Sequence, residues 1–236
     1  MDTLIIFDFD WSLIDCNSDT WVVDKLGAME RMKPLMEVLP WTQLMDTMMM
    51  ELYSDGRTLK DIDMCLQMAP MEQEMVTSVK FAAELGCELQ IISDANSHFI
   101  KVILEKHCLQ SYFTKVHTNP ALVAENGALR VLPSHPENNP PHGCKLCPPN
   151  MCKGLILDSV RLGSSENLNK RVIYIGDGGG DYCPSLKLIH GDHILARHGF
   201  PLLKFLKANI GSVKANLHEW TTARDVEKLF RTLLLT

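Results

Sequence analysis

The sequence predicts an α/β fold with an open parallel sheet, and three observations support this. Short apolar runs recur along the chain, several of them end next to an acidic residue, and helical patterns lie between them. Apolar runs that alternate with helical patterns are typical of parallel strands covered by helices. Because ligands bind beyond the carboxyl ends of such strands, the acidic residues at those ends are candidate site residues.

The predicted strands are short and rich in branched apolar residues. We expect them at 3–7 before Asp8, at 87–92 before Ser93 and Asp94, at 171–175 before Asp177, and at 193–196. Helical patterns at 97–107 and 151–162 fit connections between strands. A final amphipathic pattern at 226–235 is expected to pack on the sheet.

A long insertion separates the first two predicted strands. About 75 residues lie between Asp10 and Cys87, whereas a complete crossover unit needs roughly 30 residues. Three helices are predicted in the insertion, at 19–32, 41–54 and 58–68, and a fourth after Pro70 returns to the sheet. We therefore assign residues 1–16 and 86–236 to the core, and residues 17–85 to a helical cap with its return helix.

Methionine is concentrated in this insertion, since eleven of the thirteen methionines lie between Met29 and Met75. Methionine adapts to irregular gaps, so we interpret these residues as filler of a small helical core in preference to a ligand surface.

Charge and hydropathy argue against two classes of partner. The 236 residues include 23 Lys and Arg against 29 Asp and Glu, a formal net charge of −6, whereas nucleic-acid binders usually carry excess positive charge. No apolar run approaches the roughly 18 to 20 residues that span a bilayer. The first apolar run meets Asp8 too early for a signal peptide. We expect a cytoplasmic protein with reduced thiols and with no nucleic-acid or membrane partner; its oligomeric state is unknown.

Four motifs stand at the predicted strand and helix ends, in the order Asp8-Phe9-Asp10, Ser93-Asp94, Lys153 and Gly176-Asp177-Gly178-Gly179-Gly180-Asp181. This order resembles the haloacid dehalogenase (HAD) superfamily of phosphatases. Three further segments are Asn17-Ser18-Asp19, Ile92-Ser93-Asp94-Ala95-Asn96 and Cys147-Pro148-Pro149-Asn150-Met151-Cys152-Lys153. With them, the sequence from Leu4 to Trp220 is similar to the phosphoethanolamine/phosphocholine phosphatase family, which includes pyridoxal phosphate and thiamine phosphate phosphatase-like members.

The resemblance implies a Rossmann-like HAD core with a small helical cap of the C1 type, and a magnesium-dependent phosphatase of small phosphomonoesters. A carboxylate that attacks a phosphate meets another anion, so the site must supply positive charge. The resemblance makes Asp8 the nucleophile, Asp10 the general acid and base, and Lys153 and Ser93 the phosphate-holding groups. It places Mg²⁺ on Asp8, the backbone carbonyl of Asp10, and Asp177, with Asp181 orienting a metal-bound water or Lys153.

Two further acids match family positions that contact the group attached to phosphate, namely Asp19 and Asp94. Extra carboxylates at this place favour a cationic leaving group and repel a second phosphate that no metal bridges. The alternative is that Asp19 caps the first cap helix and Asp94 opens the next one. Trp11 departs from the family pattern, and its indole could narrow the cavity or stack on a ring.

A Cys-x2-Cys-x4-Cys pattern lies in an irregular, Pro-rich segment at 132–152, after a predicted hairpin turn at Asn126-Gly127. Cys144, Cys147 and Cys152, with His142 or His135 as a fourth ligand, fit a structural zinc site. Packing cysteines or a disulfide are the alternatives. Cys183 is expected to be a small buried residue.

Other functions stay open at this point. They are an inorganic pyrophosphatase of the same fold, a catalytically weak regulatory or binding homologue in which Trp11 blocks the site, and a zinc-dependent interaction module.

Overall fold

A six-stranded parallel sheet forms the centre of the structure. The computed structural model describes residues 2–135, 142–163 and 169–235. Within them the strand order is β3-β2-β1-β6-β7-β8, and every neighbouring pair is parallel. The strands are β1 (Thr3–Phe7), β2 (Glu88–Asn96), β3 (Phe113–Asn119), β6 (Arg171–Gly176), β7 (His193–Arg197) and β8 (Asn216–Trp220). The predicted α/β fold with a parallel sheet is confirmed.

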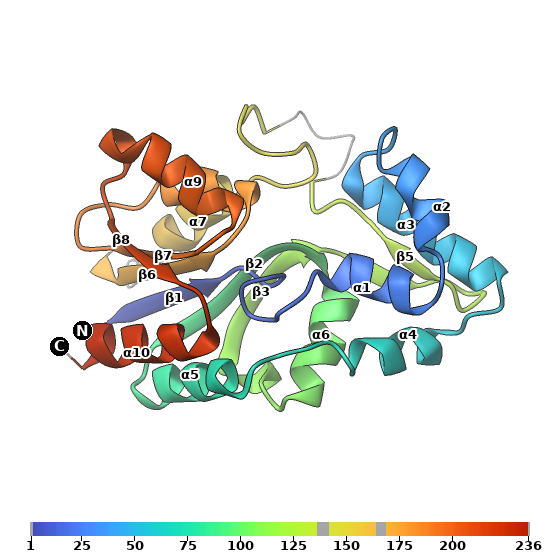
Figure 1. Cartoon of the computed structure of the whole chain (residues 1–236), viewed down its shortest axis with the longest axis horizontal. Coiled ribbons are helices and arrows are strands. Elements are labelled where there is room, and N and C mark those ends of the chain that lie inside the picture. Colours follow the sequence, from blue (N-terminus) through green and yellow to red (C-terminus); the bar gives the residue numbers. More distant parts are fainter. Residues whose placement is uncertain (1, 136–141, 164–168, 236) are drawn as a thin grey trace.

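Strand β1 lies inside the sheet, between β2 and β6, and all five of its residues are buried. Its side chains alternate between the faces, so Ile5 and Phe7 join one hydrophobic core and Leu4 and Ile6 join the other. Helices α5 (Gln73–Glu84), α6 (Ser97–Lys106) and α10 (Ala223–Leu234) cover the first face, and α7 (Lys153–Leu162) and α9 (Pro201–Ala208) cover the second (Figure 1). Asp8 therefore emerges from a fully buried strand.

The C-terminal helix packs on the sheet as expected. The ring of Phe230 in α10 lies edge-on to the ring of Phe7 in β1, with 6.1 Å between centroids. The apolar stripe of α10 thus buries against the strand that leads to Asp8.

Before α5 returns the chain to the sheet, four helices follow β1. They are α1 (Ser18–Lys25), α2 (Met29–Leu35), α3 (Trp41–Ser54) and α4 (Leu59–Leu66). The helix predicted at 41–54 is confirmed at both ends. The single helix predicted at 19–32 is wrong, because the chain takes a left-handed conformation at Gly27, with φ of 78°, and this ends α1.

Five methionines of this region are buried in the same core as Phe7: Met32, Met45, Met48, Met49 and Met75. Their burial agrees with the interpretation as core filler, although Met36, Met64 and Met68 remain exposed. The cap helices and one face of the sheet share a continuous hydrophobic cluster.

The predicted hairpin is present as β4 (Ala121–Val123) and β5 (Leu129–Val131), and Gly127 in its turn has a φ of 89°. The hairpin lies on the cap helix α3. Arg130 donates two hydrogen bonds to Asp46, at 2.7 and 2.6 Å, and the N–H of Val131 donates to the same carboxylate at 3.0 Å. A segment assigned from the sequence to the core thus packs on a helix assigned to the cap.

Two strands were not predicted, and both lie at the edges of the sheet. Strands β3 and β8 keep exposed polar residues along their length, so neither forms the apolar run that identified the inner strands. Residues 136–141 of the predicted irregular segment lie outside the described residues. In the described part of the chain, no helix combines the length and the apolar character needed to cross a membrane.

Candidate active site

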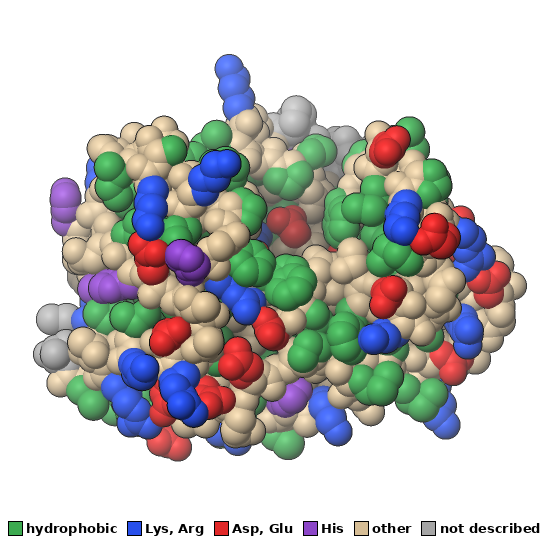
Figure 2. Space-filling view, viewed as in Figure 1, with side chains coloured by type: hydrophobic (Ala, Val, Ile, Leu, Met, Phe, Trp, Pro, Cys, Tyr) green, Lys and Arg blue, Asp and Glu red, His purple; other side chains and the backbone are tan. Residues whose placement is uncertain are grey.

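Three neighbouring strands bring predicted site residues to one edge of the sheet. Asp8 follows β1, Asp177 follows β6, and β2, which is longer than predicted, carries Ser93 and Asp94 near its end. All four line an open cavity of about 170 Å³. Figure 2 shows a hollow between the part of the molecule that carries α9 and the part that carries α2 and α3, with an acidic side chain inside it.

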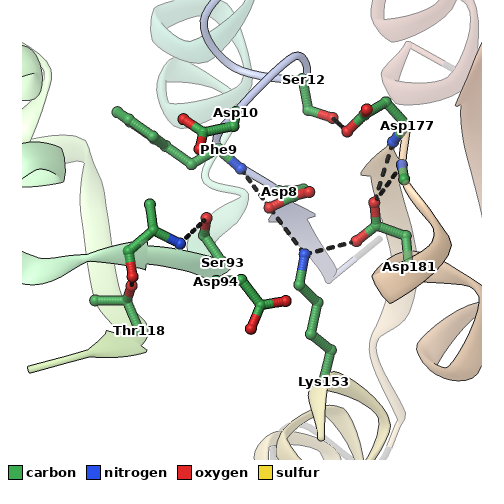
Figure 3. Close-up of polar contacts among 12 residues, drawn as sticks. Asp8, Phe9, Asp10, Ser12, Ser93, Asp94, Thr118, Lys153, Asp177 and Asp181 are labelled. Atoms are coloured by element: carbon green, nitrogen blue, oxygen red, sulfur yellow. Dashed lines mark hydrogen bonds and ion pairs between the residues drawn. The ribbon is translucent and has the colours of Figure 1, made fainter. Parts of the chain in front are cut away.

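Asp8 is a buried carboxylate that is held through its Oδ1 atom. The N–H of Phe9 donates to Oδ1 at 2.7 Å, and the Nζ of Lys153 lies 2.9 Å from the same oxygen (Figure 3). The backbone N–H of Asp8 donates to the carbonyl of Ile175 at 2.9 Å, which fixes Asp8 against β6. The carboxylate is thus oriented before any ligand binds.

Lys153 lies between two carboxylates. It is the first residue of α7, and its side chain extends to Asp8 and to Asp181, whose Oδ1 accepts a hydrogen bond from Nζ at 2.9 Å (Figure 3). Burial acts to lower the pKa of Lys153, but the charges of Asp181 and Asp8 outweigh it and raise the pKa well above its ordinary value. The ammonium is therefore charged at neutral pH.

Asp181 is fully buried and receives four hydrogen bonds. Its Oδ1 accepts from Lys153 and from the hydroxyl of Tyr174 at 2.7 Å. Its Oδ2 accepts from the N–H groups of Asp177 and Gly178 at 3.1 and 3.0 Å. With its oxygens engaged in this way, Asp181 is suited to positioning Lys153 and the turn after β6.

Negative charge exceeds positive charge at this edge of the sheet. Burial and then Asp181 raise the pKa of Asp8 well above its ordinary value, against the effect of Lys153. Burial and then Asp181 also raise the pKa of Asp177 to about 7, although Ser12 donates a hydrogen bond to it at 3.2 Å. Oxygens of Asp8, Asp177 and Asp181 lie within 4.8 Å of one another. This oxygen-only donor set fits a hard divalent cation such as Mg²⁺.

Asp10 also lines the cavity, and its carboxylate is turned to the start of α1. The N–H of Ser18 donates to Oδ1 at 2.9 Å, and Asn17, the N-cap of α1, donates to Oδ2 at 3.2 Å. Burial raises the pKa of Asp10 to about 6, against the hydrogen bond from Ser18. A carboxyl with a pKa near neutrality can both give and accept a proton.

The two acids predicted to face the leaving group have different surroundings. Asp94 lines the cavity, and its Oδ1 accepts a hydrogen bond from Asn150 at 3.1 Å. Asp19 is buried outside the cavity lining and accepts a hydrogen bond from the indole N–H of Trp41 at 2.7 Å. Burial raises the pKa of Asp19 to about 8, and nearby acids add to the effect. The alternative that Asp19 caps the helix is wrong, since Asn17 is the N-cap of α1.

Trp11 lines the cavity and is 37% exposed. Its backbone has a φ of 56°, a left-handed conformation that bulky residues rarely adopt. Arg197 donates to the carbonyl of Trp11 at 2.7 Å and lies over its ring, and the ring of Phe200 lies 5.7 Å away. The indole is therefore held at the rim of the cavity by specific contacts.

The predicted zinc ligands are only partly brought together. Four sulfur atoms lie within 4.8 Å of one another, those of Cys144, Cys147, Cys152 and Cys183. His142 is not among them, because its Nε2 donates to the carbonyl of Pro148 at 2.9 Å and its Nδ1 accepts from the N–H of Cys144 at 3.1 Å. Neither His142 nor His135 belongs to this group of ligand atoms, and Cys183 joins the three predicted cysteines instead. All eight cysteines of the chain are free thiols.

Two residues that hold the site were not predicted. Tyr174 lies inside β6, where the sequence shows only one more large residue of a buried strand and gives no signal of its bond to Asp181. Asn150 lies beside Asp94 and inside the segment 147–153 that carries the family resemblance. That resemblance was therefore a sequence signal from which Asn150 could have been identified.

Comparisons with known proteins identify relatives along the whole chain. The model of the putative phosphatase family matches residues 3–234. The chain is 45% identical to a thiamine phosphate phosphatase-like protein of Arabidopsis thaliana, over 99% of this chain and 96% of that protein. It is 42% identical to inorganic pyrophosphatase 2 of the same plant, over 98% of this chain and 83% of that protein.

The structure of a substrate-bound phosphoserine phosphatase superposes with a TM-score of 0.63 at 17% identity, covering 97% of this chain and 98% of that one. This likeness shows the fold. The chain therefore belongs to the putative phosphatase family and is a phosphatase built on the haloacid dehalogenase fold.

Proposed function

We propose that the protein is a magnesium-dependent phosphatase of small phosphomonoesters that works through a phosphorylated Asp8. The observation that carries the proposal is the charged Lys153, 2.9 Å from oxygens of both Asp8 and Asp181, at the wall of the cavity. A carboxylate beside a buried ammonium can approach a phosphate dianion because the lysine offsets their repulsion.

The chain's own residues account for both half-reactions. In the first, Oδ2 of Asp8 forms a bond to phosphorus, the bond from phosphorus to the leaving oxygen breaks, and Asp10 gives its proton to that oxygen. In the second, Asp10 takes a proton from a water that attacks the phosphorus. The bond to Asp8 then breaks and inorganic phosphate is released. The pKa of Asp10, raised by burial to about 6, suits both roles.

Asp8, Asp177 and the backbone carbonyl of Asp10 would hold Mg²⁺, which supplies positive charge for the transferred phosphoryl group when it is bound. The oxygen-only donor set and the unbalanced charge at Asp8 and Asp177 fit such an ion. Ser93, which is buried and lines the cavity, would donate its hydroxyl to a phosphoryl oxygen.

A small cationic leaving group is the substrate class that the cavity favours. Asp94 lines the cavity, so an ammonium or an electron-poor ring would be attracted there. Asp19 is buried outside the cavity lining and its pKa is raised to about 8, so it adds little negative charge at neutral pH. Candidate substrates are phosphocholine, phosphoethanolamine, pyridoxal phosphate and thiamine monophosphate. We place this activity in the cytoplasm.

Inorganic pyrophosphatase activity is the second candidate, because a plant relative with 42% identity carries that name. Pyrophosphate has no cationic group for Asp94, and its second phosphate would be repelled there unless a metal ion bridged the two. A regulatory or binding role is a third candidate, in which Trp11 would obstruct the cavity.

Asp8→Asn tests the nucleophile. The amide cannot form the acyl phosphate at a useful rate, so we expect the magnesium-supported hydrolysis of a generic aryl phosphate to fall to background. Asp24→Asn, at an exposed position of α1, should keep wild-type activity as the matched control. Wild-type turnover by Asp8→Asn would exclude Asp8 as the nucleophile. A wild-type protein that neither turns over nor becomes trapped by beryllium fluoride would favour the regulatory role.

A further inference from the structure

Four cysteines from three segments of the chain meet beside the catalytic edge. Cys144 and Cys147 belong to the irregular segment after the hairpin, Cys152 is the N-cap of α7, and Cys183 lies in the short helix α8 (Tyr182–Ser185). The sequence separates Cys152 and Cys183 by 31 positions. A pairwise packing of thiols would not require all four sulfurs to converge.

The distances between the sulfurs fit one tetrahedral metal ion. A Zn–S bond of roughly 2.3 Å gives a tetrahedron whose edges, the S···S distances, are about 3.8 Å. The Sγ of Cys183 lies 3.6 Å from the Sγ of Cys144 and 3.9 Å from that of Cys152. All four sulfurs lie within 4.8 Å of one another, so each is close to the position that a common ion requires.

The backbone is shaped to admit Cys183. A β-carbon at Gly154 would lie 2.5 Å from the Sγ of Cys183, a distance at which the two atoms overlap. Glycine at the second position of α7 therefore allows the sulfur to reach the start of the helix. The N–H of Gly154 then donates to Cys183, and the N–H of Leu155 donates to Cys152.

These N–H groups suit thiolates better than thiols. Four thiolates around one Zn²⁺ leave a net charge of −2, and the amide dipoles of the first turn of α7 stabilise negative charge at that end. α7 extends over ten residues, so its dipole is fully developed at Cys152.

A disulfide fits the geometry less well. A disulfide would require two sulfurs to approach to about 2.05 Å, whereas the distances to Cys183 are 3.6 and 3.9 Å. It would also leave the other two thiols without a partner in a cluster where four converge.

We propose that Cys144, Cys147, Cys152 and Cys183 bind one structural Zn²⁺ that joins the irregular segment, the start of α7 and helix α8. Its place in the chain gives it a positioning role. Cys152 directly precedes Lys153, Cys183 lies two residues after Asp181, and the segment between Cys147 and Cys152 carries Asn150, which donates to Asp94. One ion would thereby fix the segment that carries Asn150, the start of α7 next to Lys153, and the helix that follows Asp181.

Metal analysis of the purified full-length chain tests the site, and its readout does not depend on the phosphatase reaction. Protein prepared without chelators should contain about one zinc ion per chain, as one closed four-ligand site requires. Replacing that zinc with Co²⁺ should give the intense sulfur-to-metal charge-transfer absorption of a four-thiolate site. The wild-type cobalt spectrum remains informative even if a cysteine variant folds poorly.

Three variants identify the ligands. Cys183→Ser and Cys147→Ser should lose most of the zinc. Cys108→Ser, which changes an exposed cysteine outside the cluster, should keep all of it, and so should His142→Ala. Hydrogen exchange in zinc-free protein should rise in residues 144–155 and 178–186 more than in β1.

Several results would overturn the proposal. One is that wild-type protein contains no zinc and its cluster thiols react only after reduction. The others are that the protein holds iron in place of zinc, that Cys183→Ser retains the zinc, or that His142→Ala loses it. Loss of activity in Asp8→Asn protein that still holds zinc would leave this site intact, so the two proposals fail separately.

Discussion

A β-carbon placed on Gly176 would lie 2.6 Å from the Cγ of Asp181. The last residue of β6 is therefore glycine because the buried carboxylate that holds Lys153 packs directly against its backbone. The replacement Gly176→Ala must displace Asp181, whose hydrogen bonds to Lys153, Tyr174 and the turn after β6 would then be strained.

We expect Gly176→Ala to lower the free energy of unfolding by about 1–3 kcal/mol, as overpacking of a buried site does, and to reduce kcat more than KM. Urea denaturation and steady-state kinetics with an aryl phosphate measure the two effects. Gly211→Ala is the control, because a β-carbon there meets no atom within 4 Å. Equal stability of the two variants would contradict the packing argument.

The carboxylate of Asp94 is expected to select cationic substrates. Asp94→Asn keeps the size of the side chain that Asn150 contacts and removes its charge. The ratio of kcat/KM for phosphocholine to kcat/KM for an aryl phosphate should fall about tenfold, which corresponds to about 1.4 kcal/mol. Asp19→Asn should change this ratio less, since Asp19 lies outside the cavity lining.

A hydrolysis screen of both variants measures these ratios over phosphocholine, phosphoethanolamine, pyridoxal phosphate, thiamine monophosphate, pyrophosphate and sugar phosphates. Equal losses on cationic and neutral substrates would show that Asp94 supports turnover and does not select the leaving group. Pyrophosphate as the preferred substrate of the wild type would establish the second candidate function.

Removal of magnesium should abolish hydrolysis. The carboxylates of Asp8 and Asp177 both have pKa values raised by burial, and a bound divalent cation would restore their charged forms. After treatment with a chelator, Mg²⁺ should restore activity and Ca²⁺ should not, because Ca²⁺ prefers longer bonds and more ligands. Undiminished activity in excess chelator would refute the magnesium requirement.

His117 should make the fold less stable in acid. Burial lowers the pKa of His117 from 6.5 to about 4, and its Nε2 lies 3.0 Å from Oε1 of Gln90. Between these pKa values the unfolded chain binds a proton that the folded chain excludes, so the free energy of unfolding decreases as the pH falls.

The variant His117→Gln can still donate to Gln90 but does not titrate. Its free energy of unfolding should therefore decrease less than that of the wild type between pH of about 7 and about 5. Urea midpoints at the two pH values measure the difference, and His190→Gln, at an exposed position, should behave like the wild type. The same pH dependence in His117→Gln would assign the acid sensitivity to other groups.

The sequence predicted what depends on local pattern. The strand at 3–7 and the helix at 41–54 have the predicted bounds, because a continuous apolar run and a 3.6-residue period are visible in one segment. Strands β3 and β8 were missed since edge strands keep polar residues. The split between α1 and α2 depends on the left-handed conformation of Gly27, which composition alone does not reveal.

The site was predictable to the extent that its residues follow strand ends. Asp8, Ser93, Asp94 and Asp177 line one cavity because parallel strands end at one edge of the sheet. Contacts that cross between elements had no local signal. Tyr174 reaches Asp181 from within a strand, and Cys183 reaches three cysteines from a separate helix.

The bonds between Arg130 and Asp46 restrict how the cap can move. The chain enters the cap after β1 and leaves it at α5, and these two neighbouring crossings alone would form a hinge. The hairpin follows the edge strand β3 and packs on α3, which gives the cap a third attachment to the sheet. A rotation about the hinge must either carry the hairpin along, which bends the end of β3, or break the Asp46 contacts. An opening of the cap that leaves the hairpin in place would therefore have to break the contacts of both Asp46 and Tyr53 with the hairpin.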